Sequence, residues 1–319
     1  VESLNMISDH FVVHHLVNSA ESVTALRAQL QQKGMYGRIS VNRYDGKQLP
    51  YYDNLINLLI LNTPGSVSMA ECRRALAPNG VLMVRDPKNH EWTKTVKAWP
   101  EGLDGWPHYL YGPGNNSVNK DTTVAPPKHV RWLAGPEWMR SHENDASLST
   151  MVSDQGRLYY IYDEGPIGIT DQRLPAKWSL ISRDAFSGVV LWKVPLPNWG
   201  WREWKEQLVE ESGGFFQLTQ QRQNTPASVQ RRLVALNNKV YVTLGYQAPV
   251  SVLDGTTGKL IKSYPGTEHA DEIILHSETL VLAIRSPEET TDNVMAVSYT
   301  HLTLPTIRRG GGGGGGGGG

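Results

Sequence analysis

The feature that most constrains the fold of this chain is a motif that occurs twice. It reads Ser182-Arg-Asp-Ala-Phe-Ser-Gly-Val-Val-Leu-Trp192 and then Val252-Leu-Asp-Gly-Thr-Thr-Gly-Lys-Leu-Ile-Lys262. In each copy an Asp precedes a Gly by four residues, at Asp184 and Gly188 and again at Asp254 and Gly258. The Asp can accept the amides of a turn, and the Gly can take a positive φ before a strand resumes. A repeat of this kind between β-rich runs predicts a propeller or a related array.

The two copies resemble the tryptophan-docking motif of quinoprotein (PQQ-like) propeller blades. The resemblance implies that Trp192, at the end of the first copy, packs against a neighbouring blade as a structural lock. The second copy carries Lys262 at the corresponding place, and the docking contact is therefore not implied there.

The residues around the motif predict short strands separated by turns. Two blades and the start of a third are expected within 130–296, whereas closed propellers have about four to eight blades, so we expect a truncated propeller. The pair Asn237–Asn238 favours a two-residue hairpin. Within the insert 195–232, residues 203–211 predict a short helix. The predicted strands are 130–133, 149–153, 157–162, 178–182, 189–192, 233–236, 239–243, 250–253 and 259–262.

The first part of the chain has a different pattern, in which strands alternate with helices. A helix capped by Asn18 or Ser19 is expected to end near Gly34, and a second helix should cover 68–76. A turn is expected at Ala77–Gly80. This order predicts a partial doubly wound α/β region. Its expected strands are 11–16, 38–42, 55–61 and 81–84.

The α/β region resembles the second half of a Rossmann-like, class I S-adenosylmethionine-dependent methyltransferase. The resemblance is carried by Asp45-Gly46, Leu49-Pro-Tyr51, Asp53-Asn54 and the block Glu71-Cys-Arg-Arg-Ala-Leu-Ala-Pro-Asn-Gly-Val-Leu82. It implies that Asp45 and Gly46 lie near the adenine of the cofactor; the alternative is a turn-capping Asp.

The residues that would bind the rest of that cofactor are largely missing from the sequence. No glycine-rich turn is found, and Asn18 stands where the family has a carboxylate for the ribose hydroxyls. We therefore expect an inactive, degenerate region, with S-adenosylmethionine binding reserved for a longer protein.

Through the runs Trp132–Glu143, Asp163–Gly165 and Trp178–Trp192, the chain as a whole resembles bacterial, planctomycete-type fusions of such a region with a PQQ-like propeller. The expected division is a methyltransferase-like region at 1–87, a Pro/Gly/Trp-rich junction without regular structure at 88–129, and blades at 130–296. Residues 297–319 resemble a translated sequencing adapter followed by polyglycine, which predicts an artefactual, disordered tail. Because the chain begins at Val1 without Met or a signal-peptide pattern, we expect an internal start.

Composition narrows the function classes. The net charge is zero, which favours neither nucleic acid nor an anionic membrane surface as partner. Cys72 is the single cysteine, so an internal disulfide and a cysteine-based zinc site are excluded. No apolar run reaches the roughly 18 residues of a membrane span. The compartment stays open, the cell envelope or periplasm included.

Candidate site residues are few, and each has a plainer interpretation. Arg140, His142 and Glu143 could form a ligand-binding rim or an acid/base pair at a propeller mouth, or an exposed polar loop. Asp163-Glu164 could bind a cation or start a turn. Trp199, Trp201 and Trp204 could stack a planar ligand or pack in the core.

Two classes of function remain open. One is a noncatalytic propeller that binds an unidentified ligand or protein at its face. The other is an enzyme, either a methyltransferase or a quinone-dependent oxidoreductase; PQQ is not expected, because no set of residues places a calcium site and a catalytic Asp together. No metal site is predicted.

Overall fold

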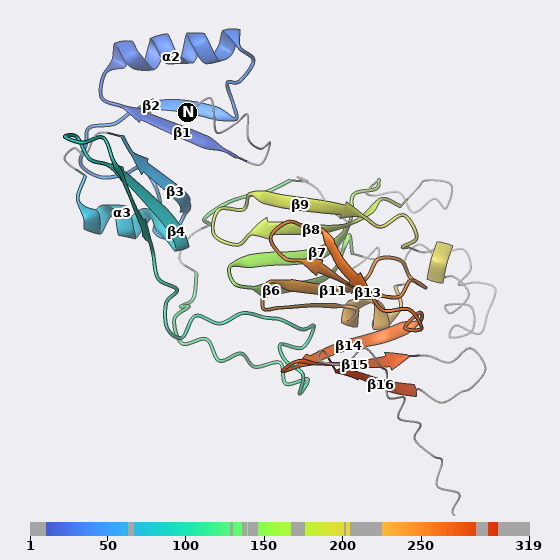
Figure 1. Ribbon diagram of the computed structural model, residues 1–319. Helices are drawn as coiled ribbons and strands as arrows, with labels where there is room; N and C mark the ends of the chain where they lie inside the picture. Colours follow the sequence, from blue (N-terminus) through green and yellow to red (C-terminus); the bar gives the residue numbers. More distant parts are fainter. Residues whose placement is uncertain are drawn as a thin grey trace, which may run out of the picture. The chain divides into compact units, whose positions relative to one another are not determined.

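A computed structural model describes residues 11–62, 67–127, 130–135, 139, 146–166, 176–200, 202–204, 225–284 and 293–298. The chain, which Figure 1 colours from blue to red along the sequence, divides into two compact units. One unit contains the α/β part up to Leu103 together with Asp121–Ala134 and Asp184–Leu191. The other contains Asp104–Lys120 and most of the β-rich remainder.

The α/β part begins with a strand–helix–strand unit. Strands β1 (Val13–Val17) and β2 (Ile39–Arg43) pair in parallel, and helix α2 (Ala20–Gln32) connects them. The Ser19 hydroxyl caps the helix by accepting a hydrogen bond from the Ser22 amide at 3.1 Å. Val23 and Leu30 of the helix are buried together with two β2 residues. The predicted elements are confirmed here.

A second strand–helix–strand arrangement follows in the same α/β part, and it differs from the prediction at one point. Strand β3 (Ile56–Leu61), helix α3 (Met69–Ala75) and strand β4 (Leu76–Arg85) form a parallel strand pair with a helical connection. The turn predicted at Ala77–Gly80 lies inside β4. Asn79 takes a positive φ of 61° and the register shifts at this level, so the chain bulges and keeps its pairing instead of reversing.

The junction contains a strand that the sequence analysis did not predict. Strand β5 (Trp92–Val96) pairs antiparallel with β4, from Trp92 opposite Arg85 to Val96 opposite Val81. The reversal is held by Asp86, whose carboxylate accepts the Lys88 amide at 2.7 Å. All five β5 residues are exposed, so no alternation of polar and apolar residues reveals the strand.

The prediction of a doubly wound sheet is not met by the described residues. Their α/β part contains two separate sheets, β1–β2 and β3–β4–β5. Each buries one apolar cluster, against α2 and α3 respectively.

The β-rich part consists of antiparallel sheets whose strands follow chain order, the arrangement of propeller blades. We call them blades 1, 2 and 3. Blade 1 contains β6 (Leu148–Asp154), β7 (Arg157–Asp163), β8 (Trp178–Asp184) and β9 (Val190–Pro195). Blade 2 contains β10 (Leu233–Leu236), β11 (Lys239–Thr243), β12 (Val250–Asp254) and β13 (Leu260–Ser263). Blade 3 contains β14 (Ala270–His276), β15 (Thr279–Ile284) and β16 (Asn293–Ser298).

Two blades and the start of a third therefore match the prediction of a propeller-like fold, and a short 3-10 helix, η3 (Ala227–Arg231), precedes blade 2. Asn237 and Asn238 both take positive φ, at 54° and 60°, as the predicted hairpin requires. The strand predicted at 130–133 is absent: residues 130–135 have no strand partner among the described residues.

Candidate functional site

The residues predicted to bind a cofactor lie together at one end of the β1–β2 sheet, which we call its carboxyl edge. Asn18 follows β1, and Asp45 and Gly46 follow β2 closely, so parallel pairing brings both groups to the carboxyl ends of the strands. The Tyr44 amide donates to the Val17 carbonyl at 2.7 Å and ties these ends together. Asn18 and Asp45 are exposed. The Asp45 carboxylate accepts the Lys47 amide at 3.0 Å, which is a turn-capping contact.

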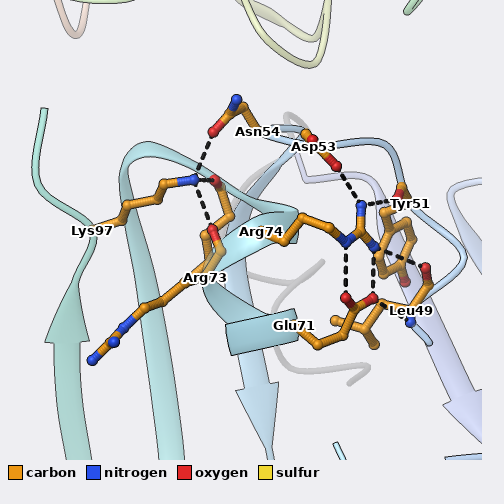
Figure 2. Close-up of polar contacts among 9 residues, drawn as sticks. Leu49, Tyr51, Asp53, Asn54, Glu71, Arg73, Arg74 and Lys97 are labelled. Carbon is orange, nitrogen blue, oxygen red and sulfur yellow. Dashed lines mark hydrogen bonds and ion pairs between the residues drawn. The ribbon is translucent and has the colours of Figure 1, made fainter. Parts of the chain in front are cut away.

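A polar network beside this edge fixes the loop that carries the methyltransferase-like residues (Figure 2). Arg74 donates to both carboxylate oxygens of Glu71, at 2.6 and 2.8 Å, and to Asp53 Oδ1 at 2.7 Å. It also donates to the carbonyls of Leu49 and Tyr51, while the Leu49 amide donates to Glu71 Oε1 at 2.8 Å. The network therefore anchors residues 49–53 to α3.

The electrostatics of the network follow from these contacts. Hydrogen bonding from Arg74 lowers the pKa of Glu71 to about 2, and the pKa of Arg74 is raised in turn by Glu71 and Asp53. Glu71 and Arg74 both belong to the block that resembles a methyltransferase, but their contact was not predicted. Their three-residue spacing on a helix, which places them side by side, could have indicated it.

Lys97 makes a second anchor in the same view (Figure 2). Its ammonium donates to Asn54 Oδ1 at 2.6 Å and to the carbonyls of Arg73 and Leu76, each at 2.7 Å. It thereby satisfies acceptors at the carboxyl end of α3. Burial lowers the pKa of Lys97.

A partly buried pair joins the loop to the sheet. The Tyr51 hydroxyl is 3.0 Å from His14 Nδ1, within hydrogen-bond distance. Burial raises the pKa of Tyr51 to about 12 and lowers that of His14. Both side chains are therefore neutral at neutral pH, and the pair joins the loop to β1.

Acid should loosen this loop selectively. Because the pKa of Glu71 falls from an ordinary value near 4.5 to about 2, its stabilising contribution is present above pH 4.5 and is lost as the pH falls through 2. We expect Glu71→Gln to speed amide exchange of residues 44–54 at neutral pH. Between pH 4.5 and pH 2 the loop of the wild-type protein should loosen further, whereas the loop of Glu71→Gln should change less. Hydrogen exchange followed by mass spectrometry measures this, with the exposed Glu101→Gln as control. Equal acid sensitivity of wild type and Glu71→Gln would contradict it.

The repeated motif forms the same turn in both blades. Asp184 Oδ1 accepts the amides of Phe186 and Ser187 and the Ser187 hydroxyl, at 3.1, 2.6 and 2.7 Å. Asp254 Oδ1 accepts the corresponding groups of Thr256 and Thr257 at 3.1, 2.8 and 2.8 Å. The hydrogen bonds from Thr257 are the main reason that the pKa of Asp254 is lowered. Both carboxylates serve their own turns.

Each turn also receives a tryptophan. Trp192 donates from Nε1 to the Gly255 carbonyl at 3.0 Å, and a Cβ placed on Gly258 would lie 2.6 Å from the indole ring. Trp132 does the same at the blade 1 turn: it donates to the Ala185 carbonyl at 3.1 Å, and a Cβ on Gly188 would lie 2.5 Å from its ring. Glycine is thus needed for close approach and for its positive φ.

The docking role of Trp132 was missed by the sequence analysis, although Val130-Arg-Trp132 shares a Val-x-Trp pattern with Val190-Leu-Trp192. At the position of the missing third tryptophan, the Lys262 ammonium lies 4.6 Å from the centre of the Tyr264 ring.

The two ends of the blades differ in their connections. At one end, which we call the turn end, short turns follow β6, β8, β10, β12 and β14 at 155–156, 185–189, 237–238, 255–259 and 277–278. At the other, the loop end, longer connections follow β7, β9, β11, β13 and β15. These are residues 164–177, 196–232, 244–249, 264–269 and 285–292.

Buried aromatic residues lie beneath the loop end. Trp204 contacts Trp178 and Tyr246 edge to face, with ring centres 5.8 and 6.0 Å apart, and Trp199 is also buried. Trp201 lies outside the described residues. Trp199 and Trp204 thus belong to the core, and neither presents a ring for stacking on a ligand.

The other predicted polar sites divide into two groups. Asp163 is buried and accepts the amides of Gly165 and Lys177 at 2.9 and 2.7 Å, which closes the base of the β7–β8 connection. Glu164 forms an ion pair with Lys193. The predicted rim of Arg140, His142 and Glu143 lies outside the described residues.

Neither a metal-binding cluster nor a membrane-spanning helix occurs among the described residues. No group of three or more His, Cys, Asp or Glu side chains is arranged to hold a metal ion. No described helix has the length and apolar character needed to cross a bilayer.

Comparison with known proteins gives distant structural matches. No protein family and no curated protein matches the sequence. Among solved structures, the chain is similar to BamB from Moraxella catarrhalis, with 9% identity and a TM-score of 0.31 over 51% of this chain and 35% of that one. It is also similar to the quinohemoprotein alcohol dehydrogenase from Comamonas testosteroni, with 14% identity and a TM-score of 0.30 over 61% and 25% of the two chains. The chain thus spans about a third and a quarter of their lengths.

Proposed function

We propose that the blades form a noncatalytic binding or assembly platform whose binding face is the loop end. The observation that carries this proposal is the difference in connection length between the two ends. In repeat folds, insertions that concentrate on one face commonly form the binding surface, since a rigid scaffold then positions variable loops.

The use of the acidic residues supports a platform over an enzyme. Asp184 and Asp254 are engaged in turns, and Asp163 closes a loop base. A quinone-dependent dehydrogenase would need carboxylates that face a bound calcium and quinone instead.

We further propose that the α/β region is a degenerate methyltransferase-like module joined to the platform. Asn18 lacks the charge of a ribose-binding carboxylate, and Asp45 already caps a turn. The proposed division remains 1–87, 88–129 and 130–296, with β5 as a junction strand that extends the sheet of β3 and β4.

Charge reversal at the two ends tests the platform. Lys177 and Lys193 lie at the loop end, whereas Lys239 and Lys259 flank turns at the turn end. We expect Lys177→Glu/Lys193→Glu to weaken capture of partner proteins from an extract of the source cells at least about tenfold. The matched control Lys239→Glu/Lys259→Glu should capture them as wild type does. Equal loss in both variants would overturn the assignment of the loop end.

Cofactor titration tests the same proposal from the enzyme side. S-adenosylmethionine by calorimetry, and PQQ with calcium by quenching of tryptophan fluorescence, should both give no saturable binding. Saturable binding of either cofactor would replace the platform by the corresponding enzyme.

A further inference from the structure

We propose that His108 makes an acid-sensitive contact that controls residues 104–111, which we call the crossing segment. The neutral imidazole fastens this segment to β14, the first strand of blade 3, and protonation releases it. The proposal does not depend on which end of the blades binds a partner.

The crossing segment first joins blades 1 and 2. Trp106 and Ser153 of β6 are bridged by two main-chain hydrogen bonds, in which the Trp106 amide donates at 3.1 Å and the Ser153 amide at 2.8 Å. The Ala235 amide of β10 donates to the Pro107 carbonyl at 2.9 Å. Because β6 and β10 lie next to each other, two consecutive residues of the segment reach the first strands of two consecutive blades. None of these groups is titratable, so these two contacts do not respond to pH.

The contact with blade 3 is made by an ionisable side chain instead. The His108 side chain is buried, and its Nε2 accepts a hydrogen bond from the Leu275 amide of β14 at 3.1 Å. A ring nitrogen of histidine accepts only while it carries no proton, so the proton of the neutral imidazole lies on Nδ1. The neutral form is therefore the form that fastens the segment to β14.

The surroundings of the ring do not suit an imidazolium. Nδ1 of His108 is buried and has no hydrogen-bond partner among the described residues. Protonation places an N–H on Nε2 opposite the Leu275 amide, so that two donors face each other and the hydrogen bond to β14 is lost. A buried donor without an acceptor is costly, and the cost is relieved when the segment leaves the strand.

Charged groups near the ring do not supply the missing partner. The Glu272 carboxylate of β14 favours the protonated form, but it pairs with Arg231 of η3 at 2.9 Å. Asp104 of the crossing segment accepts the Tyr111 hydroxyl at 2.6 Å. The remaining ionisable side chains of β6, β10, β14 and η3 are Asp154 and Asp271, which are hydrogen-bonded elsewhere, and His276, which is exposed. The site therefore favours a neutral imidazole.

The direction of the pH effect follows from this burial. Burial is the largest effect on His108 and lowers its pKa below the ordinary value of 6.5, while main-chain hydrogen bonding with Tyr111 and Leu275 and the charge of Glu272 oppose it without offsetting it. The released segment thus binds a proton more readily than the fastened one. The contact is complete above pH 6.5 and weakens as the pH falls from 6.5 towards the pKa of the folded state. Over that interval the equilibrium constant for release rises by up to about tenfold per pH unit.

Amide hydrogen exchange of the full chain, followed by mass spectrometry between about pH 8 and pH 5, tests the proposal. In wild type, the protection factors of peptides covering 104–111 and Leu275 should fall by up to about tenfold per pH unit below 6.5. In His108→Gln they should change little with pH, because the amide oxygen of glutamine can accept from Leu275 but does not ionise. His276→Gln is the matched control, since this exposed histidine of β14 should respond as wild type does.

Exchange of the histidine C2 hydrogens in wild type reports the titration of His108 directly, so the proposal stays testable if His108→Gln does not fold. His108 should titrate below pH 6.5. Titration at or above that value would overturn the proposal, as would pH-independent protection of the crossing segment in wild type. An equal pH response of His108→Gln and wild type would also overturn it. None of these outcomes bears on capture of partners at the loop end.

Discussion

Replacing Arg232 by methionine is expected to lower the free energy of unfolding of the blades by about 3–5 kcal/mol, the usual cost of breaking a buried ion pair from one side. The Arg232 side chain is 2% exposed and donates to Asp271 Oδ1 at 2.7 Å and to the Tyr246 carbonyl at 2.6 Å. Its guanidinium also lies 4.5 Å from the centre of the Tyr246 ring. Methionine fills similar space but leaves the Asp271 carboxylate without this donor.

The neighbouring residue supplies the control for this prediction. Arg231 pairs with Glu272 at 2.9 Å, but its side chain is 39% exposed, so Arg231→Met should cost no more than about 1 kcal/mol. Both pairs join the segment before blade 2 to the first strand of blade 3. Urea denaturation followed by circular dichroism compares the two variants. Equal losses of unfolding free energy in the two variants would contradict the idea that burial makes the Arg232 pair contribute more than the Arg231 pair.

Local features of the fold could be predicted from the sequence because local chemistry determines them. The turn at Asp254–Gly258 depends on a carboxylate, two amides and a positive φ within five residues. The hairpin at Asn237–Asn238 and the cap at Ser19 are equally short-range. Each could be inferred without knowing what packs on it.

Contacts between distant residues could not be predicted in this way. Arg232 and Asp271 are 39 residues apart, and Trp132 and Ala185 are 53 apart. Nothing in the sequence around a single arginine or tryptophan in a loop identifies its partner. The Val-x-Trp pattern becomes informative only once Trp192 of β9 is known to dock on the turn of blade 2. In β4, Asn79 and Gly80 carry turn chemistry, but pairing with β3 keeps the segment in the strand. Tertiary pairing therefore prevailed over local preference.

The lock at Trp192 gives the second large effect, and it tests whether adjacent blades are held by the repeated motif. Trp192→Ala should cost about 3–5 kcal/mol, because a buried indole is lost together with its hydrogen bond to the Gly255 carbonyl. The ring also packs on Gly258 and contacts Tyr159 at 5.9 Å between ring centres, so a cavity opens between blades 1 and 2.

Trp92→Ala is the control for the Trp192 variant, since Trp92 is 46% exposed in β5 and should change stability by about 0.5 kcal/mol or less. Urea denaturation gives both values. A loss under about 1 kcal/mol for Trp192→Ala would mean that the aliphatic contacts between blades suffice without the lock. The interface after blade 2, where Lys262 replaces the tryptophan, would then be as stable as the interface between blades 1 and 2. A large loss indicates that the Lys262 interface is the less stable one, because there an ammonium on the Tyr264 ring replaces an indole on a glycine turn.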